Sequence, residues 1–184
     1  MRLFALALDH RRSRGRVGGM KKLLLIVCGI SLLAGCGDGG DPDSVDLEDP
    51  SVRKELSEKA ISYGDLQMRK KGNDNLFFAP GEDSPYSGWV KEQWSAGHDK
   101  SLRHFKEGKQ DGPYTRWYEN KKKKESGHFK NGMQDGQRAE WYENGQKKEV
   151  GNFKDGQQDG VWVTYRDGKE LYRQTFKDGK EVQP

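Results

Sequence analysis

The feature that most constrains this chain is an internal repeat of 24 residues between Gly88 and Gly160. Pairs ending in glycine recur at this interval, at Ser87-Gly88, Asp111-Gly112, Asp135-Gly136 and Asp159-Gly160. A fixed period of this length indicates an array of similar small units. One such unit cannot bury its own apolar face, so neighbouring units must stack. The chain is therefore expected to present an extended surface.

Each unit is predicted to be a β-hairpin. In the unit that begins at Gly136, residues 137–143 are expected to form one strand and residues 146–153 the return strand. Asn144-Gly145 between them is a strong hairpin signal, because both residues tolerate positive φ. This register places Tyr142 opposite Lys147. Turns are expected at Gly112, Gly136, Asn144, Gly145 and Gly160, and also at Asp155-Gly156.

Aromatic residues recur with the same period, and all five tryptophans lie in the array. Repeat-equivalent residues in a two-strand unit stand about 10 Å apart. The rings are therefore expected to form ladders, either holding a thin sheet together or lining a groove for a peptide or glycan. Trp117 and Trp141 are expected on the face opposite Tyr142. The candidate binding surface consists of Trp117, Trp141, Trp162, Tyr118 and Tyr142.

Two strands per unit in chain order predict a mainly β fold. We expect an extended single-layer antiparallel β-meander of about four 24-residue hairpin repeats, preceded by a short capping helix and a disordered tether. The unit Gly136–Gly160, which contains WYENGQKKEVGNFKDGQQDG, resembles the variant MORN repeat of bacterial proteins. The resemblance extends from about Tyr86 to Gly179, with a lead-in from Leu66. It implies a single-layer sheet with a binding role and no catalytic residues.

Many chains with such repeats carry the label of a YwqK-type antitoxin. The second unit of this chain departs from the repeat pattern, because Lys121 stands where the turn glycine belongs. The tip of that hairpin is therefore expected to be less ordered. Lys121 also opens a run of four lysines, which is either a solvated tip or a contact for acidic lipid head groups, peptidoglycan carboxylates or an acidic partner.

Residues 1–35 are predicted to be a signal peptide. Met20-Lys21-Lys22 precedes an apolar run from Leu23 to Leu33, and a basic start with a short apolar core describes a secretory signal. Met20 is an alternative start, which would make residues 1–19 a gene-model extension. The sequence Leu33-Ala34-Gly35-Cys36 resembles a bacterial lipobox. That resemblance implies cleavage before Cys36 and attachment of lipid to this residue.

Removal of the leader changes the charge balance. The full chain has 33 basic and 29 acidic residues, of which seven basic and one acidic lie in residues 1–35, so the remainder has a net charge of −2. This balance removes the compositional support for nucleic-acid binding. Cys28 leaves with the leader and Cys36 carries lipid. No disulfide is therefore expected within the mature chain.

Three segments follow the leader. Residues 36–49 are predicted to be the lipidated cysteine and an acidic flexible tether, because Gly37 to Pro50 holds six carboxylates and few apolar residues. Residues 50–85 are expected to form a short helix and lead-in strands, and residues 86–184 the repeat array.

The helix has recognisable ends. Asp49 suits its N-cap and Pro50 its first turn, and Gly64 is placed to end it. Strands are then expected at Leu66–Arg69 and Leu76–Phe78, around Gly72-Asn73.

No motif for catalysis stands out. The sequence holds no phosphate-binding glycine loop, nucleophile elbow or HExxH pair. His104 and His128 are repeat-equivalent, but about 10 Å separates such positions, whereas zinc needs its ligand nitrogens within about 3.5 Å. We therefore expect no enzyme, no metal, no cofactor and no small-molecule substrate.

The sequence as a whole predicts an envelope-anchored lipoprotein that acts as a non-catalytic binding module. Its membrane contact would be the lipid on Cys36, and its partner an unidentified protein or glycan. Gly37 after Cys36 favours the periplasmic face of the outer membrane. Two alternatives stay open: an immunity or antitoxin-like protein that neutralises a partner toxin, and lipid-surface or peptidoglycan binding by the repeat array.

Overall fold

The computed structural model of the chain describes residues 42–183. The predicted signal peptide, Cys36 and the start of the tether lie outside the described residues. The main sheet consists of β1 Ile61–Ser62, β4 Gly88–Gln93, β5 Asp99–Lys106, β6 Lys109–Trp117, β7 Lys123–Lys130, β8 Met133–Gln134, β9 Gly136–Trp141, β10 Lys147–Lys154, β11 Gln157–Gln158, β12 Gly160–Arg166, β13 Lys169–Lys177 and β14 Lys180–Val182.

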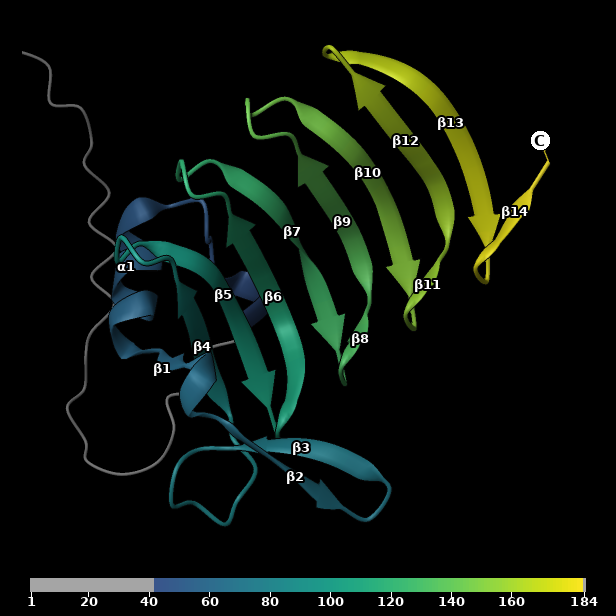
Figure 1. The fold of residues 1–184 in the computed structure, drawn as a ribbon. Helices are drawn as coiled ribbons and strands as arrows, with labels where there is room; N and C mark the ends of the chain where they lie inside the picture. Colours follow the sequence, from purple (N-terminus) through teal and green to yellow (C-terminus); the bar gives the residue numbers. More distant parts are fainter. Residues whose placement is uncertain (1–41, 184) are drawn as a thin grey trace, which may run out of the picture. The chain divides into compact units, whose positions relative to one another are not determined.

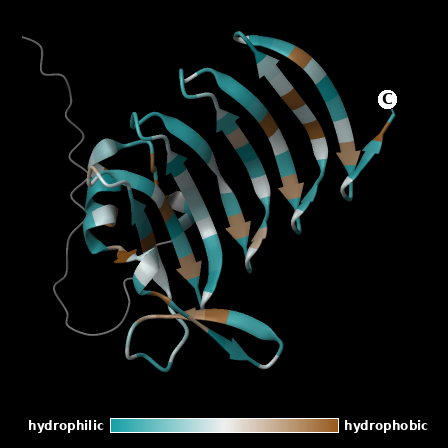
Figure 2. Ribbon diagram, viewed as in Figure 1, coloured by the Kyte–Doolittle hydropathy of each residue, from teal (hydrophilic) through white to brown (hydrophobic). Residues whose placement is uncertain are grey.

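These strands confirm the predicted meander. From β4 onward they pair antiparallel in chain order, with β8 beside β7 and β11 beside β10 (Figure 1). Apolar residues form narrow bands that recur on successive strands, and most of each strand is hydrophilic (Figure 2). The sheet therefore has no thick core of the kind that a two-layer fold buries.

The capping helix α1 (Pro50–Lys59) begins as predicted, with the Asp49 carboxylate accepting from the N–H groups of Ser51 and Val52. It ends at Lys59, earlier than the predicted end at Gly64. The reason is that Ala60 takes an extended conformation, and Ile61 then pairs in parallel with β4. After the short helix η2 (Tyr63–Asp65), β2 (Gln67–Lys71) and β3 (Asp74–Phe78) form the expected lead-in hairpin as a separate sheet.

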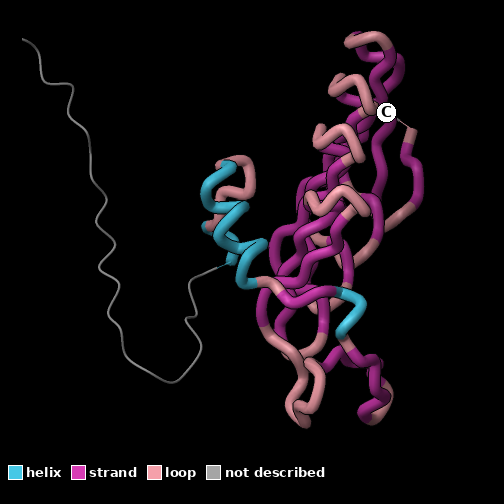
Figure 3. Tube along the Cα trace, turned by 60° about the vertical axis from the view of Figure 1, so that its left-hand side comes forward, coloured by secondary structure: helices cyan, strands magenta, loops and turns pink. Residues whose placement is uncertain are grey.

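The acidic segment before α1 is ordered from Pro42 onward, which corrects the prediction of disorder for residues 42–49. It contains the helical turn η1 (Pro42–Ser44), and Leu47 is buried against Leu102 and Trp117. Its carboxylates reach β7, where Asp43 contacts His128 and Glu48 pairs with Lys123. The helix α1 lies on one side of the strands (Figure 3). One buried leucine and two polar contacts order a stretch whose composition suggested a tether.

The two faces of the sheet are defined by alternation along the strands and by cross-strand pairing. Face A carries Arg103, Tyr114, Glu125, Arg138 and Trp162, and face B carries Leu102, Thr115, Ala139, Val150 and Val163. The buried cluster around Leu47 and α1 lies on face B.

Tight turns join successive units, but most of them lie at other positions than the predicted turn pairs. Both residues of each tight turn have positive φ, as a type I′ turn requires; these turns are Glu107-Gly108, Asn131-Gly132, Asp155-Gly156 and Asp178-Gly179. Of these, only Asp155-Gly156 was expected.

The predicted turn residues Gly112, Gly136 and Gly160 instead lie a few residues farther on, at irregularities of the ladder, with φ of 110°, 93° and 85°. The aspartate before each of the first two glycines accepts a hydrogen bond from the next tight turn: Asn131 N–H donates to Asp111 at 2.8 Å and Asp155 N–H to Asp135 at 3.3 Å. The recurring Asp-Gly pair thus joins one unit to the next.

The tips of the first three hairpins contain three-residue loops, so Tyr142 does not face Lys147, whereas the fourth tip is the two-residue turn Asp167-Gly168. Tyr142 donates its N–H to Gln146 at 2.9 Å and accepts from Gly145 at 2.8 Å. Only Gly145 of this loop has positive φ, the pattern of a type I turn followed by a left-handed residue. Lys147 pairs with Trp141, and a bulge at Lys148 restores the predicted register from Glu149 to Phe153.

The tip at Lys121 keeps the same geometry without glycine. Lys121 has φ 65°, and its N–H donates to Tyr118 at 3.0 Å, while Tyr118 N–H donates to Lys122 at 2.8 Å. The hydrogen bonds of this tip match those of the Tyr142 tip, so the expected loss of order is not seen.

On face A, large rings lie over glycines of the neighbouring strand. Tyr114 covers Gly127 and Trp162 covers Gly151, where an added Cβ would fall 3.0 Å and 2.2 Å from ring atoms. Trp162 also meets Phe153 edge-on, with ring centroids 5.1 Å apart. Such pairs contribute about 0.5–1.5 kcal/mol each beyond the area they bury. These rings stabilise a thin sheet in place of a second layer.

Replacing Gly151 with alanine is expected to lower the free energy of unfolding by about 1–3 kcal/mol, because Trp162 must leave its rotamer to admit a methyl group. Urea denaturation followed by circular dichroism measures this change. Gly64→Ala is the matched control, since its nearest neighbour atom to an added Cβ is 3.8 Å away. Equal stabilities for the two variants would contradict the ring-over-glycine packing.

Candidate functional site

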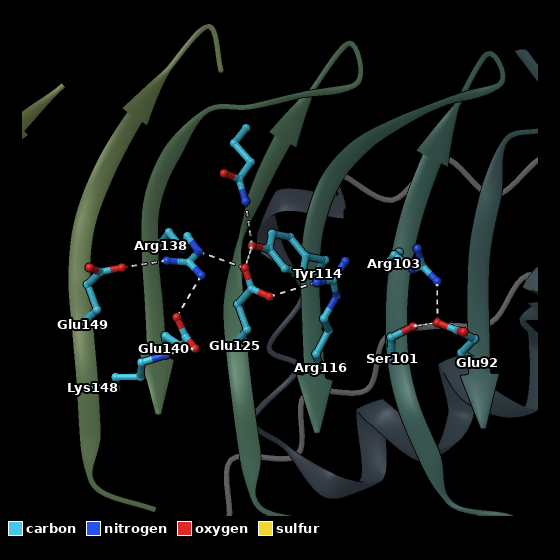
Figure 4. A network of polar contacts seen from close by, with 11 residues as sticks. Glu92, Ser101, Arg103, Tyr114, Arg116, Glu125, Arg138, Glu140, Lys148 and Glu149 are labelled. Atoms are coloured by element: carbon cyan, nitrogen blue, oxygen red, sulfur yellow. Dashed lines mark hydrogen bonds and ion pairs between the residues drawn. The ribbon is translucent and has the colours of Figure 1, made fainter. Parts of the chain in front are cut away.

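A band of charged side chains crosses face A at mid-strand (Figure 4). It is termed the charged band, and its members are Glu92, Ser101, Arg103, Tyr114, Arg116, Glu125, Arg138, Glu140, Lys148 and Glu149. Strands β4 to β10 supply them, because residues two apart on a strand share a face. The ladder sets them opposite one another, as in the pairs Glu92 with Ser101 and Arg116 with Glu125.

Glu125 is the centre of the charged band. Its carboxylate accepts from Arg138 Nε at 2.8 Å, from Tyr114 Oη at 2.8 Å and from Arg116 Nη1 at 3.0 Å. Burial by itself would raise the pKa of Glu125, but these hydrogen bonds and the two guanidinium charges outweigh it and hold the pKa below its ordinary value. Burial and the neighbouring Glu125 charge raise the pKa of the Tyr114 hydroxyl.

Arg138 links three carboxylates. Besides Glu125, it donates to Glu140 and Glu149, both at 3.0 Å. Burial alone would lower the pKa of Arg138, but the bond and charge of Glu125 and the charge of Glu140 raise it. Lys148 completes this end of the band with a 2.8 Å bond to Glu140, which raises the pKa of Lys148.

A second arm of the charged band centres on Glu92, which accepts from Arg103 at 2.9 Å and from Lys100 and Ser101 at 3.3 Å. Burial would raise the pKa of Glu92, but the hydrogen bond from Lys100 and the two positive charges lower it. The neighbouring cations thus hold Glu92 and Glu125 ionised at neutral pH. Carboxylates with a lowered pKa are weak bases. They can contribute charge and hydrogen-bond acceptors to the binding of a ligand.

The histidines and carboxylates do not gather into a metal site. Within residues 42–183, no three His, Cys, Asp or Glu side chains are grouped to hold a metal ion. His104 Nδ1 lies 2.6 Å from the Asp111 carbonyl oxygen, whereas His128 contacts Asp43. The two repeat-equivalent histidines therefore have separate partners.

The predicted ring surface is not one groove. Trp117 is buried on face B, 5% exposed, with the Arg53 guanidinium 5.1 Å from its ring centroid. Trp162 is equally buried on face A, and Trp141 is half-buried beside Lys123. Two of the three tryptophans are therefore packing residues on opposite faces, which corrects the groove interpretation.

Tyr118 and Tyr142 have a different role, since each joins its unit to the next. Their hydroxyl groups donate to the carbonyl oxygens of Trp141 at 2.8 Å and Tyr165 at 3.2 Å. The indole N–H of Trp94 does the same at 3.3 Å to Trp117. These tip aromatics repeat because they form a hydrogen bond between units.

Reasoning from the sequence missed the charged band. One signal was available, because Arg138 occupies the repeat position at which Tyr114 and Trp162 provide rings. A charge at a position that is aromatic in the neighbouring units indicates a buried ion pair.

Comparison of the chain with protein-family models, with curated proteins and with solved structures found no match. In the part of the chain that the structure describes, no helix has the length and apolar character needed to cross a bilayer. Function is therefore inferred from the residues of the chain itself.

Replacing Glu125 with glutamine is expected to lower the free energy of unfolding at pH 7 by about 3 kcal/mol, because it removes the buried carboxylate charge that Arg116, Arg138 and Tyr114 share. The folded-state pKa of Glu125 is depressed, so its contribution is complete above its unfolded pKa and is lost as the pH falls through the folded value. The difference in free energy of unfolding between the variant and the parent should therefore become smaller below about pH 4. Urea denaturation at several pH values measures this difference.

The control for this experiment is Glu143→Gln, at an exposed carboxylate on a hairpin tip. Its stability should follow the parent at every pH. If the difference in free energy of unfolding between Glu125→Gln and the parent stays constant from pH 7 to pH 3, the guanidinium groups do not stabilise the charge of the carboxylate.

Proposed function

We propose that this chain is a lipid-anchored, non-catalytic binding module of the bacterial cell envelope, in which variant MORN hairpins present a sheet surface to a protein or glycan. The observation that carries the proposal is that the sheet is stabilised within one layer. Its contacts run between neighbouring units, through the tip aromatics, the Asp-Gly pairs and the charged band.

The helical segments pack at the start of the array, where α1 contacts β4 and η1 contacts β6. Among the described residues, strands β9 to β14 are held by their own ladder and side chains. Apolar side chains in this half are exposed, with Val161 at 46%, Leu171 at 49% and Tyr172 at 50%. An open sheet surface with exposed apolar side chains supports binding of a partner over an extended area. It gives less support to catalysis, which uses an enclosed site.

The anchor in this proposal is Cys36, at the lipobox-like sequence. Between Cys36 and the ordered segment that begins at Pro42, an extended chain reaches at most about 20 Å. Because Leu47, Asp43 and Glu48 hold the following residues to the sheet, lipid on Cys36 would keep the array close to the membrane surface. Two acyl signals give stable anchoring, since each buried CH₂ contributes about 0.8 kcal/mol.

The anchor is tested by growing cells that express the full chain with a clickable palmitate analogue. The parent and Cys28→Ser proteins should take up label and sediment with membranes, whereas Cys36→Ser should do neither. Cys28→Ser is the matched control, because it removes the only other thiol of the chain. Label on Cys36→Ser, or none on the parent, would refute lipid anchoring at this residue.

A further inference from the structure

The charged band has a regular pairing that the second unit breaks. Each of the first three hairpins has a bulge occupied by a lysine: Lys100, Lys124 and Lys148. In the first hairpin this lysine pairs with Glu92 at 3.3 Å, and in the third with Glu140 at 2.8 Å. The bulge lysine and the glutamate eight residues before it, on the paired strand of the same hairpin, therefore form a repeated ion pair.

In the second hairpin the glutamate position is Arg116. Its guanidinium turns to Glu125, at 3.0 Å, and Lys124 is left with the ring of Tyr118, 5.4 Å from its Nζ. Among the described residues, no carboxylate forms an ion pair with Lys124. A position that holds a carboxylate in both neighbouring hairpins thus holds a second cation here.

A cavity of about 290 Å³ opens beside these two cations, on the side of the first hairpin. Besides Arg116 and Lys124, its walls are formed by Glu92, Trp94, Lys100, Ser101 and Trp117. The Glu92 carboxylate already accepts from Arg103, Lys100 and Ser101, so its charge is paired within the sheet. The indole N–H of Trp94 is already bonded to Trp117, so the ring offers an apolar wall and not a donor. The cavity therefore combines positive charge, a hydroxyl group and a flat apolar surface.

The charges around the cavity do not balance within the charged band. Together with Lys100 and Lys124, the band has six cations, and these face the carboxylates of Glu92, Glu125, Glu140 and Glu149. Arg116 shares Glu125 with Arg138, and the other carboxylates are shared by Arg103, Arg138 and the two paired lysines. Among the described residues of the band, the cation left without a carboxylate is therefore Lys124. An added negative charge would therefore be bound next to Lys124 and Arg116.

We propose that this cavity binds a carboxylate from a partner polypeptide, the side chain of a glutamate or aspartate, which takes the place that Glu92 and Glu140 have in the neighbouring hairpins. Arg116 and Lys124 bind the carboxylate oxygens, and the alkyl part of the acidic residue packs on Trp94. A carboxylate fits because the adjacent units bind one with the same lysine position. An Arg fork beside a lysine matches two oxygens in one plane.

This inference rests on the proposed binding role of the sheet, but not on the lipid anchor. Palmitate labelling at Cys36 and ligand binding on face A are measured separately, so either can fail while the other stands.

The test uses the full chain in detergent micelles, labelled with ¹⁵N, and follows the indole N–H signals of its five tryptophans. The probes are acetyl-Gly-Glu-Gly-amide, its glutamine analogue and inorganic phosphate, at low ionic strength because salt screens exposed charges. Trp94→Phe identifies the Trp94 signal. We expect a saturable shift of that signal with the glutamate peptide, at least tenfold weaker binding of the glutamine peptide, and weaker binding of phosphate.

Three variants localise the binding site. Lys124→Gln should weaken binding of the glutamate peptide at least fivefold, whereas Lys148→Gln, at the equivalent paired lysine, should leave it within twofold. Arg116→Glu should abolish binding by giving Lys124 an internal carboxylate, and the other four indole signals report whether each variant is folded. Equal binding of the glutamine peptide, stronger binding of phosphate, or equal effects of the two lysine variants would overturn the proposal.

Discussion

The stability of this sheet depends on the junctions between successive hairpins, where backbone pairing is short in the later units. Within the third hairpin, β9 and β10 pair six residues along their length. Between the later hairpins, β10 pairs with β12 only at Glu149 and Val150, and β7 with β9 only at Glu125 and Ser126, whereas β5 and β6 pair at five positions at the first junction. Side chains must therefore hold one unit to the next, and they do so at three levels: the tip aromatics, the charged band and the Asp-Gly pairs.

The charged band occupies the middle of these junctions. Arg138 on β9 reaches Glu125 on β7 and Glu149 on β10, so one guanidinium spans the third hairpin and its junction with the second. Removing charges from water offsets much of what such pairs gain by attraction. Their clearest effect is on register, because a slip by one residue would turn Arg138 to the opposite face. Face A is therefore both the surface that fixes the array and the one that carries unpaired positive charge.

The sequence predicted the antiparallel order of the long strands because the 24-residue period and the turn residues are local signals, but it did not predict the short strands β1, β8, β11 and β14. It misplaced the turns between units, since Asn131-Gly132 and Asp111-Gly112 both read as turn pairs and only side-chain hydrogen bonds distinguish them. It also missed the ordering of residues 42–49, because the contacts of Leu47 lie on β5 and β6. Predicting the charged band would have required knowing which residues of different units share a face. The bulges at Lys124 and Lys148 alter that assignment near each tip.

The array folds as a single layer without a partner covering it. Hydrogen–deuterium exchange of the isolated full chain tests this single-layer folding, by comparing the backbone amides of β9, β10 and β12 with those of the hairpin tips. The structure predicts that the strand amides exchange orders of magnitude more slowly than the tip amides in every unit, including those beyond the reach of α1. Strand amides in β9 to β12 that exchange as quickly as the tips would contradict it, because the C-terminal half would then need a second layer in order to fold.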